Sequence, residues 1–238
     1  MKKSIEKNET LICILTIIIY LLTNSYFINN YGISNYKTTI LNIILSLIII
    51  IYIIKNKLTK YYGLKKFSIN KENLYYVPLV LITSVNLWTG ININNTKLEI
   101  IFYIINMIFV GFLEEIIFRG FLYKMMEKDN ITRATIISSL TFGIGHIINL
   151  FNGAEIIPTL LQVIYATSTG YLFIIIFQKE KSLWPCIITH SLINSLSIFN
   201  NQNNPNILYI SSIFLIIVPI LYSIYLKKKK QTKIYFNK

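Results

Sequence analysis

Two adjacent carboxyl groups and two imidazoles stand inside long apolar stretches of this 238-residue sequence. Of the ten acidic residues, only Glu114 and Glu115 lie deep in such a stretch, and the two histidines of the chain, His146 and His190, lie in two others. An ionisable group at the centre of a membrane costs at least about 2.5–3.5 kcal/mol. These four residues are therefore candidates for a functional site.

Helical spacing assigns these side chains to faces. Glu115 and Arg119 are four residues apart and share a face, so the guanidinium can neutralise and orient this carboxylate. Glu114 is rotated by about 100° from Glu115, and no basic residue stands four positions away from it. His190 and Asn194 also share a face. Glu114 is therefore free to face a partner other than Arg119.

Aromatic and small residues surround the first histidine. Phe142 and His146 are four residues apart, so the ring can form a wall beside the imidazole. Gly120, Gly143 and Gly145 leave room for neighbouring helices to approach closely.

These residue types suit the activation of water. A buried carboxylate beside a neutral imidazole can hold a water molecule and take its proton. A second imidazole and a carboxamide can donate hydrogen bonds to a developing oxyanion. Glu114, His146, His190 and Asn194 thus predict a peptidase site, and no serine or cysteine occupies an evident nucleophile position.

Other interpretations of the single residues remain open. Glu115 with Arg119 could be a structural salt bridge, and either histidine could make a hydrogen bond between helices. Glu114, His146 and His190 could also bind zinc. Since no HExxH helix is present, we predict no metal cofactor and keep zinc as the alternative.

The elements that must carry these residues are membrane helices. Hydrophobic residues make up 54% of the chain and charged residues 14%, against about 25% charged in soluble domains. Eight apolar segments approach the roughly 20 residues that cross a bilayer. They are 11–28, 39–54, 74–92, 100–123, 132–150, 156–177, 184–199 and 207–226. We predict an all-α, polytopic membrane helix bundle of about eight transmembrane helices.

Lysine and arginine collect in alternate connections, which orients the bundle. The net charge is +13, and cytoplasmic loops carry the excess of basic residues in membrane proteins. Both termini are then cytoplasmic, and the lysines contact anionic membrane lipid rather than nucleic acid. The Ile-, Asn- and Lys-rich composition suggests a bacterial chain, hence a multi-pass protein of the bacterial cytoplasmic membrane. No feature of the sequence indicates an oligomeric state.

This topology also predicts depth. At 1.5 Å per residue, Glu114 lies roughly 15 Å from the end of its span at Lys124, and His146 roughly 20 Å from Arg133. We expect a polar layer in the cytoplasmic half, with substrate entering from that half. The extracellular ends of these helices look apolar, so a transporter is the least favoured alternative.

The same residues carry a family resemblance. In order and spacing they resemble the EExxxR, FxxxH and HxxxN motifs of the CPBP family, the CAAX protease and bacteriocin-processing intramembrane peptidases, also called Abi. The matching segments are 114–119, 142–146 and 190–194. The expected organisation is 1–100 for spans without a motif, 101–200 for a catalytic core, and 201–238 for a last span with a basic tail.

The resemblance implies roles for individual residues. Glu114 would activate water together with His146, while His190 and Asn194 would form the oxyanion site. Glu115 and Arg119, together with Phe142 beside His146, would support them. The family is viewed as glutamate peptidases without a metal.

The implied activity is an intramembrane endopeptidase acting on a membrane-associated peptide or protein. Eukaryotic relatives trim prenylated proteins, whereas bacterial relatives are linked to bacteriocin maturation and self-immunity. The alternative is a non-proteolytic membrane immunity or scaffold protein.

Overall fold

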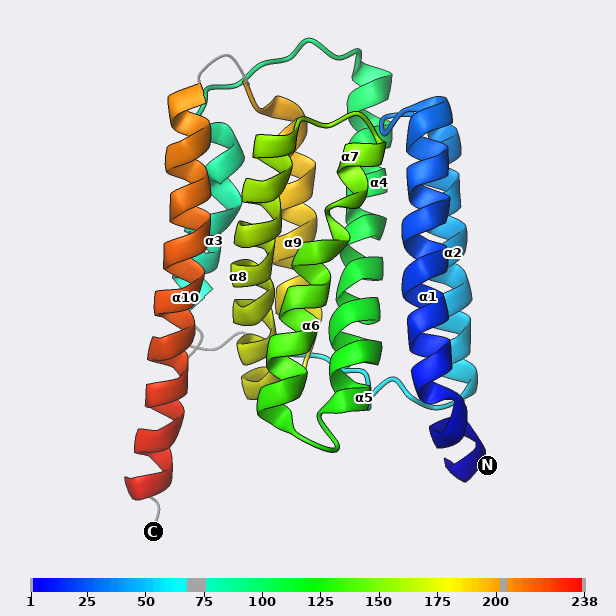
Figure 1. Ribbon diagram of the computed structural model, residues 1–238, viewed down its shortest axis with the longest axis vertical. Helices are drawn as coiled ribbons and strands as arrows, with labels where there is room; N and C mark the ends of the chain where they lie inside the picture. The colour runs from blue at the N-terminus through cyan, green and yellow to red at the C-terminus, as the bar shows by residue number, and fades with distance from the viewer. Residues whose placement is uncertain (1, 68–75, 202–204, 237–238) are drawn as a thin grey trace.

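The computed structural model describes residues 2–67, 76–201 and 205–236, which form helices joined by turns (Figure 1). The elements, in chain order, are α1 (Lys2–Tyr31), α2 (Tyr36–Lys55), α3 (Val77–Ser84), η2 (Val85–Leu87), α4 (Lys97–Glu115), η3 (Ile116–Tyr123), α5 (Lys124–Met126), α6 (Ile131–Gly145), α7 (Ile148–Phe151), α8 (Ile156–Glu180), α9 (Trp184–Leu196), η4 (Ser197–Phe199) and α10 (Pro205–Phe236). Within these ranges the only strand-like pairing is one isolated bridge between Ile91 and Asn200. The predicted all-α class is confirmed.

Six segments of the described chain are long and apolar enough to cross a membrane. They are Glu9–Tyr31, Tyr36–Lys55, Lys97–Met126, Ile131–Phe151, Ile156–Glu180 and Asn206–Lys228. The protein is therefore a multi-pass integral membrane protein. Many isoleucines and leucines on the outside of these helices are exposed, as expected for side chains that face lipid.

Of the eight predicted segments, six form long apolar helices in the described chain and two form short helices. The segment predicted at 74–92 forms α3 and η2, an apolar helix of Val77–Leu87. The segment predicted at 184–199 forms α9 and η4. Polar residues end both helices early, and α9 buries much of its length against protein, so its length does not need to match the bilayer.

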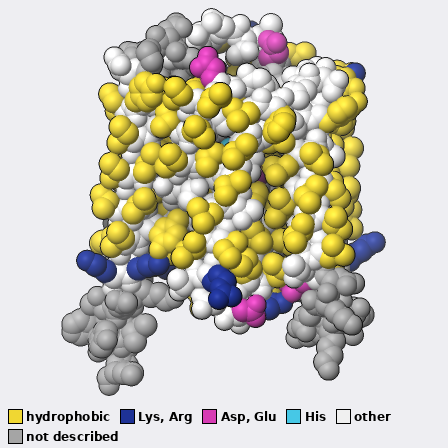
Figure 2. All heavy atoms as spheres, viewed as in Figure 1, with side chains coloured by type: hydrophobic (Ala, Val, Ile, Leu, Met, Phe, Trp, Pro, Cys, Tyr) yellow, Lys and Arg dark blue, Asp and Glu magenta, His cyan; other side chains and the backbone are white. Residues whose placement is uncertain are grey.

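The two ends of the bundle differ in charge. We call one end of the bundle the Lys-rich end (Figure 1). Helix α1 begins there, and α2, α5, α8 and α10 end there. The turns at the opposite end, 32–35, 88–96 and 152–155, contain no lysine or arginine, and we call it the Lys-poor end. Figure 2 shows a band of hydrophobic side chains with lysine and arginine gathered along its lower edge. Which side of the membrane each end faces stays a prediction.

Glycine allows two pairs of helices to touch closely. A Cβ on Gly111 of α4 would lie 2.5 Å from Ser191 Oγ of α9, and one on Gly143 of α6 would lie 2.0 Å from Thr167 Oγ1 of α8. The prediction of close approach is confirmed at Gly143. At Gly120 and Gly145 an added Cβ would make only ordinary contacts, of 3.6 and 3.8 Å. The tight contact at Gly111 was not predicted.

Buried carboxamides join the first helices to α4. Asn42 of α2 donates to Asn24 Oδ1 of α1 and to Asn106 Oδ1 of α4, both at 2.8 Å. Hydrogen bonds of this kind hold membrane helices together. The cluster therefore fixes α1 and α2 against the helix that carries the glutamate pair.

Candidate active site

Glu115 is the buried anchor of the site. Its Oε1 lies 2.8 Å from His190 Nδ1 and 3.1 Å from Arg119 Nη1, and Glu115 and Arg119 are both completely buried. The guanidinium also lies 4.1 Å from the centre of the Phe142 ring, a favourable cation–π distance. Because Glu115 engages Nδ1, the Nε2 atom of His190 is left to face Glu114.

A change of helix type follows the glutamate pair. Ile116–Tyr123 form a π-helix, and all eight of its residues are buried. π-helical turns are uncommon and frequent at functional sites. This one contains Arg119, and the ion pair with Glu115 that the four-residue spacing predicted is formed.

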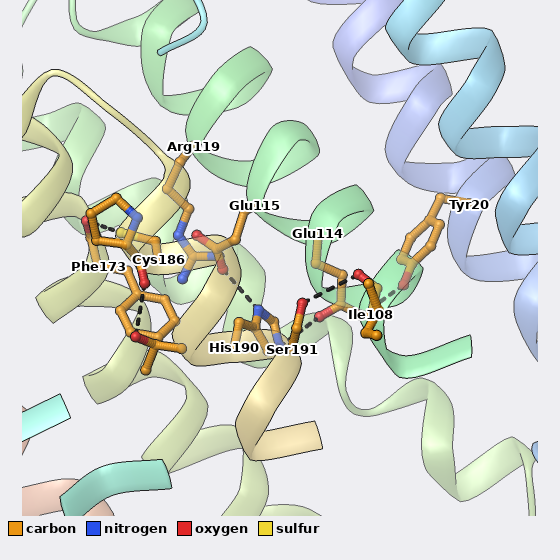
Figure 3. Close-up of polar contacts among 11 residues, drawn as sticks. Tyr20, Ile108, Glu114, Glu115, Arg119, Phe173, Cys186, His190 and Ser191 are labelled. Carbon is orange, nitrogen blue, oxygen red and sulfur yellow. Dashed lines mark hydrogen bonds and ion pairs between the residues drawn. The ribbon is translucent and has the colours of Figure 1, made fainter. Parts of the chain in front are cut away.

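Glu114 lies between two helices that come from distant parts of the chain (Figure 3). Its Oε1 accepts a hydrogen bond of 2.8 Å from Tyr20 Oη on α1, and its Oε2 lies 3.4 Å from His190 Nε2 on α9. The carboxylate is thus hydrogen-bonded through Oε1, while Oε2 faces His190 without a hydrogen bond, and its side chain is 13% exposed. Glu114 does face a partner other than Arg119, as its rotation from Glu115 predicted.

The side chains of His146 and Asn194 are available to bind a ligand. Both line a cavity together with Glu114, and within the described residues neither side chain makes a hydrogen bond. His146 follows the last residue of α6, in a turn before α7. Phe142 packs edge-on against both imidazoles, with ring centres 5.2 Å from His146 and 5.6 Å from His190. The aromatic wall is therefore shared by the two histidines.

Two cavities meet at these residues. The larger cavity, of about 210 Å³, contains Glu114 in its wall. The smaller cavity, of about 160 Å³, is lined by His190 and by mostly apolar residues such as Phe173 and Leu215. The residues common to both are Phe142, His146, Gln162, Asn194 and Ser197. At about 30 Å³ per water, the larger cavity has room for about seven water molecules.

The serine that follows His190 and the cysteine near the start of α9 are both engaged with carbonyl groups. Ser191 Oγ donates to the Ile108 carbonyl at 3.2 Å, and Cys186 Sγ donates to the Phe173 carbonyl at 3.3 Å. Neither side chain is hydrogen-bonded to a histidine in the described structure, so neither has the base that an activated nucleophile needs.

The possible metal ligands do not form a metal-binding set. Among the described residues, no three His, Cys, Asp or Glu side chains are arranged to hold a metal ion. Glu114, His146 and His190, the trio named as the zinc alternative, are therefore not brought together in that way. Metal independence of the reaction stays a prediction.

Sequence reasoning missed Tyr20. This tyrosine is 5% exposed and reaches Glu114 across 94 residues of sequence. The chain has 17 tyrosines, and no motif distinguishes this one. Only the packing of α1 against α2 and η3 brings the two residues together.

The fold and the site define a multi-pass membrane protein with a buried glutamate–histidine centre. Residues 96–196 match the family model described as type II CAAX prenyl endopeptidase Rce1-like. The resemblance noted from the three motifs is confirmed for this segment, which contains all the predicted site residues.

A curated relative has a name of the same kind. The chain is 31% identical over 93 residues to "Putative membrane peptidase YdiL" of Bacillus subtilis strain 168. The aligned region is 39% of this chain and 34% of YdiL, so the chain matches about a third of the length of that relative.

Proposed function

We propose that this protein is an intramembrane endopeptidase of the CPBP type that hydrolyses a peptide bond of a membrane-associated peptide or protein. One observation carries the proposal. The Glu114 carboxylate is fixed between Tyr20 and His190 at the wall of a cavity, where His146 and Asn194 have no other hydrogen-bonding partner among the described residues. The match of 96–196 to an endopeptidase family supports it.

In the proposed reaction Glu114 acts as the base. A water molecule held between Glu114 and His146 loses a proton to the carboxylate as its oxygen bonds to the carbonyl carbon. The oxyanion that forms is stabilised by the Asn194 amide and by His190. When the C–N bond breaks, Glu114 returns the proton to the leaving nitrogen, so the products are a carboxylic acid and an amine.

Glu115, Arg119 and Phe142 have positioning roles in this scheme. Glu115 holds His190 through Nδ1, and Arg119 compensates the charge of Glu115. Phe142 separates the two imidazoles and covers Arg119. None of the three needs to touch the reacting atoms.

The proposed setting is the bacterial cytoplasmic membrane, with a substrate in bacteriocin maturation or self-immunity. The reaction as written needs no metal ion. The competing function is immunity or scaffolding by binding alone, and it is distinguished by whether Glu114 is required.

The test compares newly formed peptide termini in membranes that contain the wild type, Glu114→Gln or Glu127→Gln at equal levels. Glu127 pairs with Lys124 at the Lys-rich end, outside the site, so its variant controls for loss of a carboxylate. We expect termini in the wild type and the control that are absent in Glu114→Gln and unchanged by a chelator.

Each other result has a defined meaning. Identical termini with folded Glu114→Gln would refute the proposed base. Termini lost on chelation would replace the metal-free reaction with the zinc alternative. A Glu114→Gln variant that still protects a bacteriocin-producing strain would favour immunity by binding.

A further inference from the structure

The larger cavity is elongated along α4. Along α4 its lining runs from Glu114 back through Val110 to Tyr103, near the start of that helix. Eleven residues of helix correspond to about 16 Å. On the neighbouring elements the lining includes Ser25 near the end of α1 and Asn152 just after α7. All these positions lead towards the Lys-poor end.

In the opposite direction the described residues are closely packed. Next to Glu114 towards the Lys-rich end come the buried pair of Glu115 and Arg119, followed by the π-helix. Ile117, Tyr123 and Phe177 pack there with at most 4% of their surface exposed. Neither of the two cavities includes Glu115, Arg119 or Tyr123 in its lining. Among the described residues, the cavity beside Glu114 therefore extends towards the Lys-poor end and not into this packed region.

The lining is rich in uncharged polar groups. Its carboxamides and hydroxyls come from Tyr20, Asn24, Ser25, Tyr103, Asn106, Asn149, Asn152, Gln162, Asn194 and Ser197. Its only ionisable acid and base are Glu114 and His146. A carboxamide offers a donor and an acceptor, as a peptide group does. In a membrane such groups are costly unless water or peptide satisfies them.

Part of this hydrogen-bonding capacity is unused. Ser25 donates to Asn152 Oδ1 at 2.6 Å, and Asn149 donates to Gln162 Oε1 at 2.9 Å. In both bonds the amide oxygen is the acceptor, so the NH₂ group is not used. Within the described chain, the NH₂ groups of Asn152 and Gln162 donate no hydrogen bond. They remain available to donate to carbonyl oxygens of a bound peptide.

We propose that the substrate enters the larger cavity from the Lys-poor end as an uncharged peptide segment, its main chain bonding to the carboxamide lining. Since basic residues mark the cytoplasmic side, this end is the outer face of the membrane, and the substrate segment is one already exported. The inference rests on the proposed endopeptidase function. It reverses the expectation that substrate enters from the cytoplasmic half and that the far ends of these helices are apolar.

The route can be tested without measuring activity. Val110→Cys places a thiol in the cavity wall, and Lys66→Cys places one on the exposed surface at the Lys-rich end. The natural cysteines, Cys13 and Cys186, are buried. Each variant is treated, in right-side-out and in inside-out membrane vesicles, with a charged methanethiosulfonate reagent that does not cross membranes.

We expect Val110→Cys to react only in right-side-out vesicles and Lys66→Cys only in inside-out vesicles. Reaction of Val110→Cys only in inside-out vesicles, in both orientations or in neither would overturn the route. Reaction of Lys66→Cys in right-side-out vesicles would overturn the outward orientation. If Val110→Cys is not recovered in membranes, Met107→Cys repeats the test one turn nearer the Lys-poor end.

The result is separable from that of the proposed function. Labelling is expected to be unchanged in a Glu114→Gln background, because it reports access and not hydrolysis. If labelling follows the expected pattern but no termini depend on Glu114, the route stands and the peptidase function fails. If termini depend on Glu114, they should map to exported segments of their substrates. Cleavage sites in cytoplasmic loops would overturn the inference.

Discussion

The two halves of α4 lie in opposite surroundings. Towards the Lys-rich end, Glu115 and the π-helix are packed against α6, α8 and α9 with almost no exposed surface. Towards the Lys-poor end, the same helix lines a cavity of about 210 Å³ with Tyr103 and Asn106. The glutamate pair lies at the boundary, with Glu115 in the packed region and Glu114 on the cavity.

The difference supports the distinct roles that we propose for the two adjacent glutamates. A group that must meet water and substrate needs open space on one side, and a group that orients it needs a rigid support. One helix supplies both environments within one residue step, because successive side chains are rotated by about 100°. Substitutions in the two regions should therefore fail differently, in stability or in turnover.

The largest effect is expected in the packed region. Arg119→Met leaves the Glu115 carboxylate buried without its cation, which should lower the free energy of unfolding by about 3–5 kcal/mol. Thermal unfolding in detergent micelles measures the loss. Lys124→Met is the control, since its pair with Glu127 is partly exposed and should contribute at most about 1 kcal/mol. Equal losses in the two variants would refute the description of Arg119 as the support.

The next effect tests the support without removing any functional group. A Cβ on Gly170 of α8 would lie 2.9 Å from Arg119 Nη2 and 3.0 Å from the Phe142 ring. Gly170→Ala should displace both, and a displacement of about 1 Å can lower turnover about 100-fold. Gly120→Ala is the matched control, because its nearest contact would be 3.6 Å. Wild-type turnover in Gly170→Ala would contradict the positioning role.

A smaller effect is expected at the boundary itself. Tyr20→Phe removes the hydroxyl that donates to Glu114, a hydrogen bond to a charged group worth about 1.5–3 kcal/mol. We expect kcat to fall by about tenfold or more with KM unchanged. Tyr103→Phe removes a hydroxyl that bonds Ser197 in the same cavity. A comparable fall of kcat in Tyr103→Phe would show that polarity of the cavity, rather than the bond to Glu114, is what matters.

The smallest effect is expected at the Lys-rich surface. Desolvation lowers the pKa of Lys128, but the hydrogen bonds and charge interactions with Glu9 and Tyr61 together outweigh this, and the net pKa is raised. The pair therefore stabilises the fold at neutral pH, and this contribution is lost as the pH rises through the raised value. Because Lys128 is 41% exposed, Lys128→Gln should change the unfolding free energy by less than about 1 kcal/mol. A larger change, measured by thermal unfolding at pH 7, would contradict the surface assignment.

The sequence predicted the parts of the site that local helical geometry determines. Glu115 meets Arg119, and Phe142 packs beside His146, because residues four apart share a helix face. The motif spacing also predicted that three helices carry the site. By contrast, the contact from Tyr20 and the close approach at Gly111 depend on how separate helices pack, and periodicity within one helix contains no information on that.

The cavities beside the site were not predicted, for a related reason. Counting residues from a charged end gives a height along one helix. It does not reveal where small and polar side chains of several helices leave a hollow. Similarly, the segments around α3 and α9 are apolar enough to suggest full spans. Their short length follows from polar residues at their ends and from neighbours that replace lipid.

The carboxamide cluster of Asn24, Asn42 and Asn106 limits which foreign helix could replace α1. Asn24 stands four residues from Tyr20 on α1, and the cluster ties it through α2 to the helix of Glu114. It thereby sets the axial register between α1 and α4. A chimera that receives a foreign apolar first helix would keep its membrane insertion. It would lose the alignment that brings a phenol to the glutamate, unless the grafted helix repeats the four-residue interval between tyrosine and asparagine.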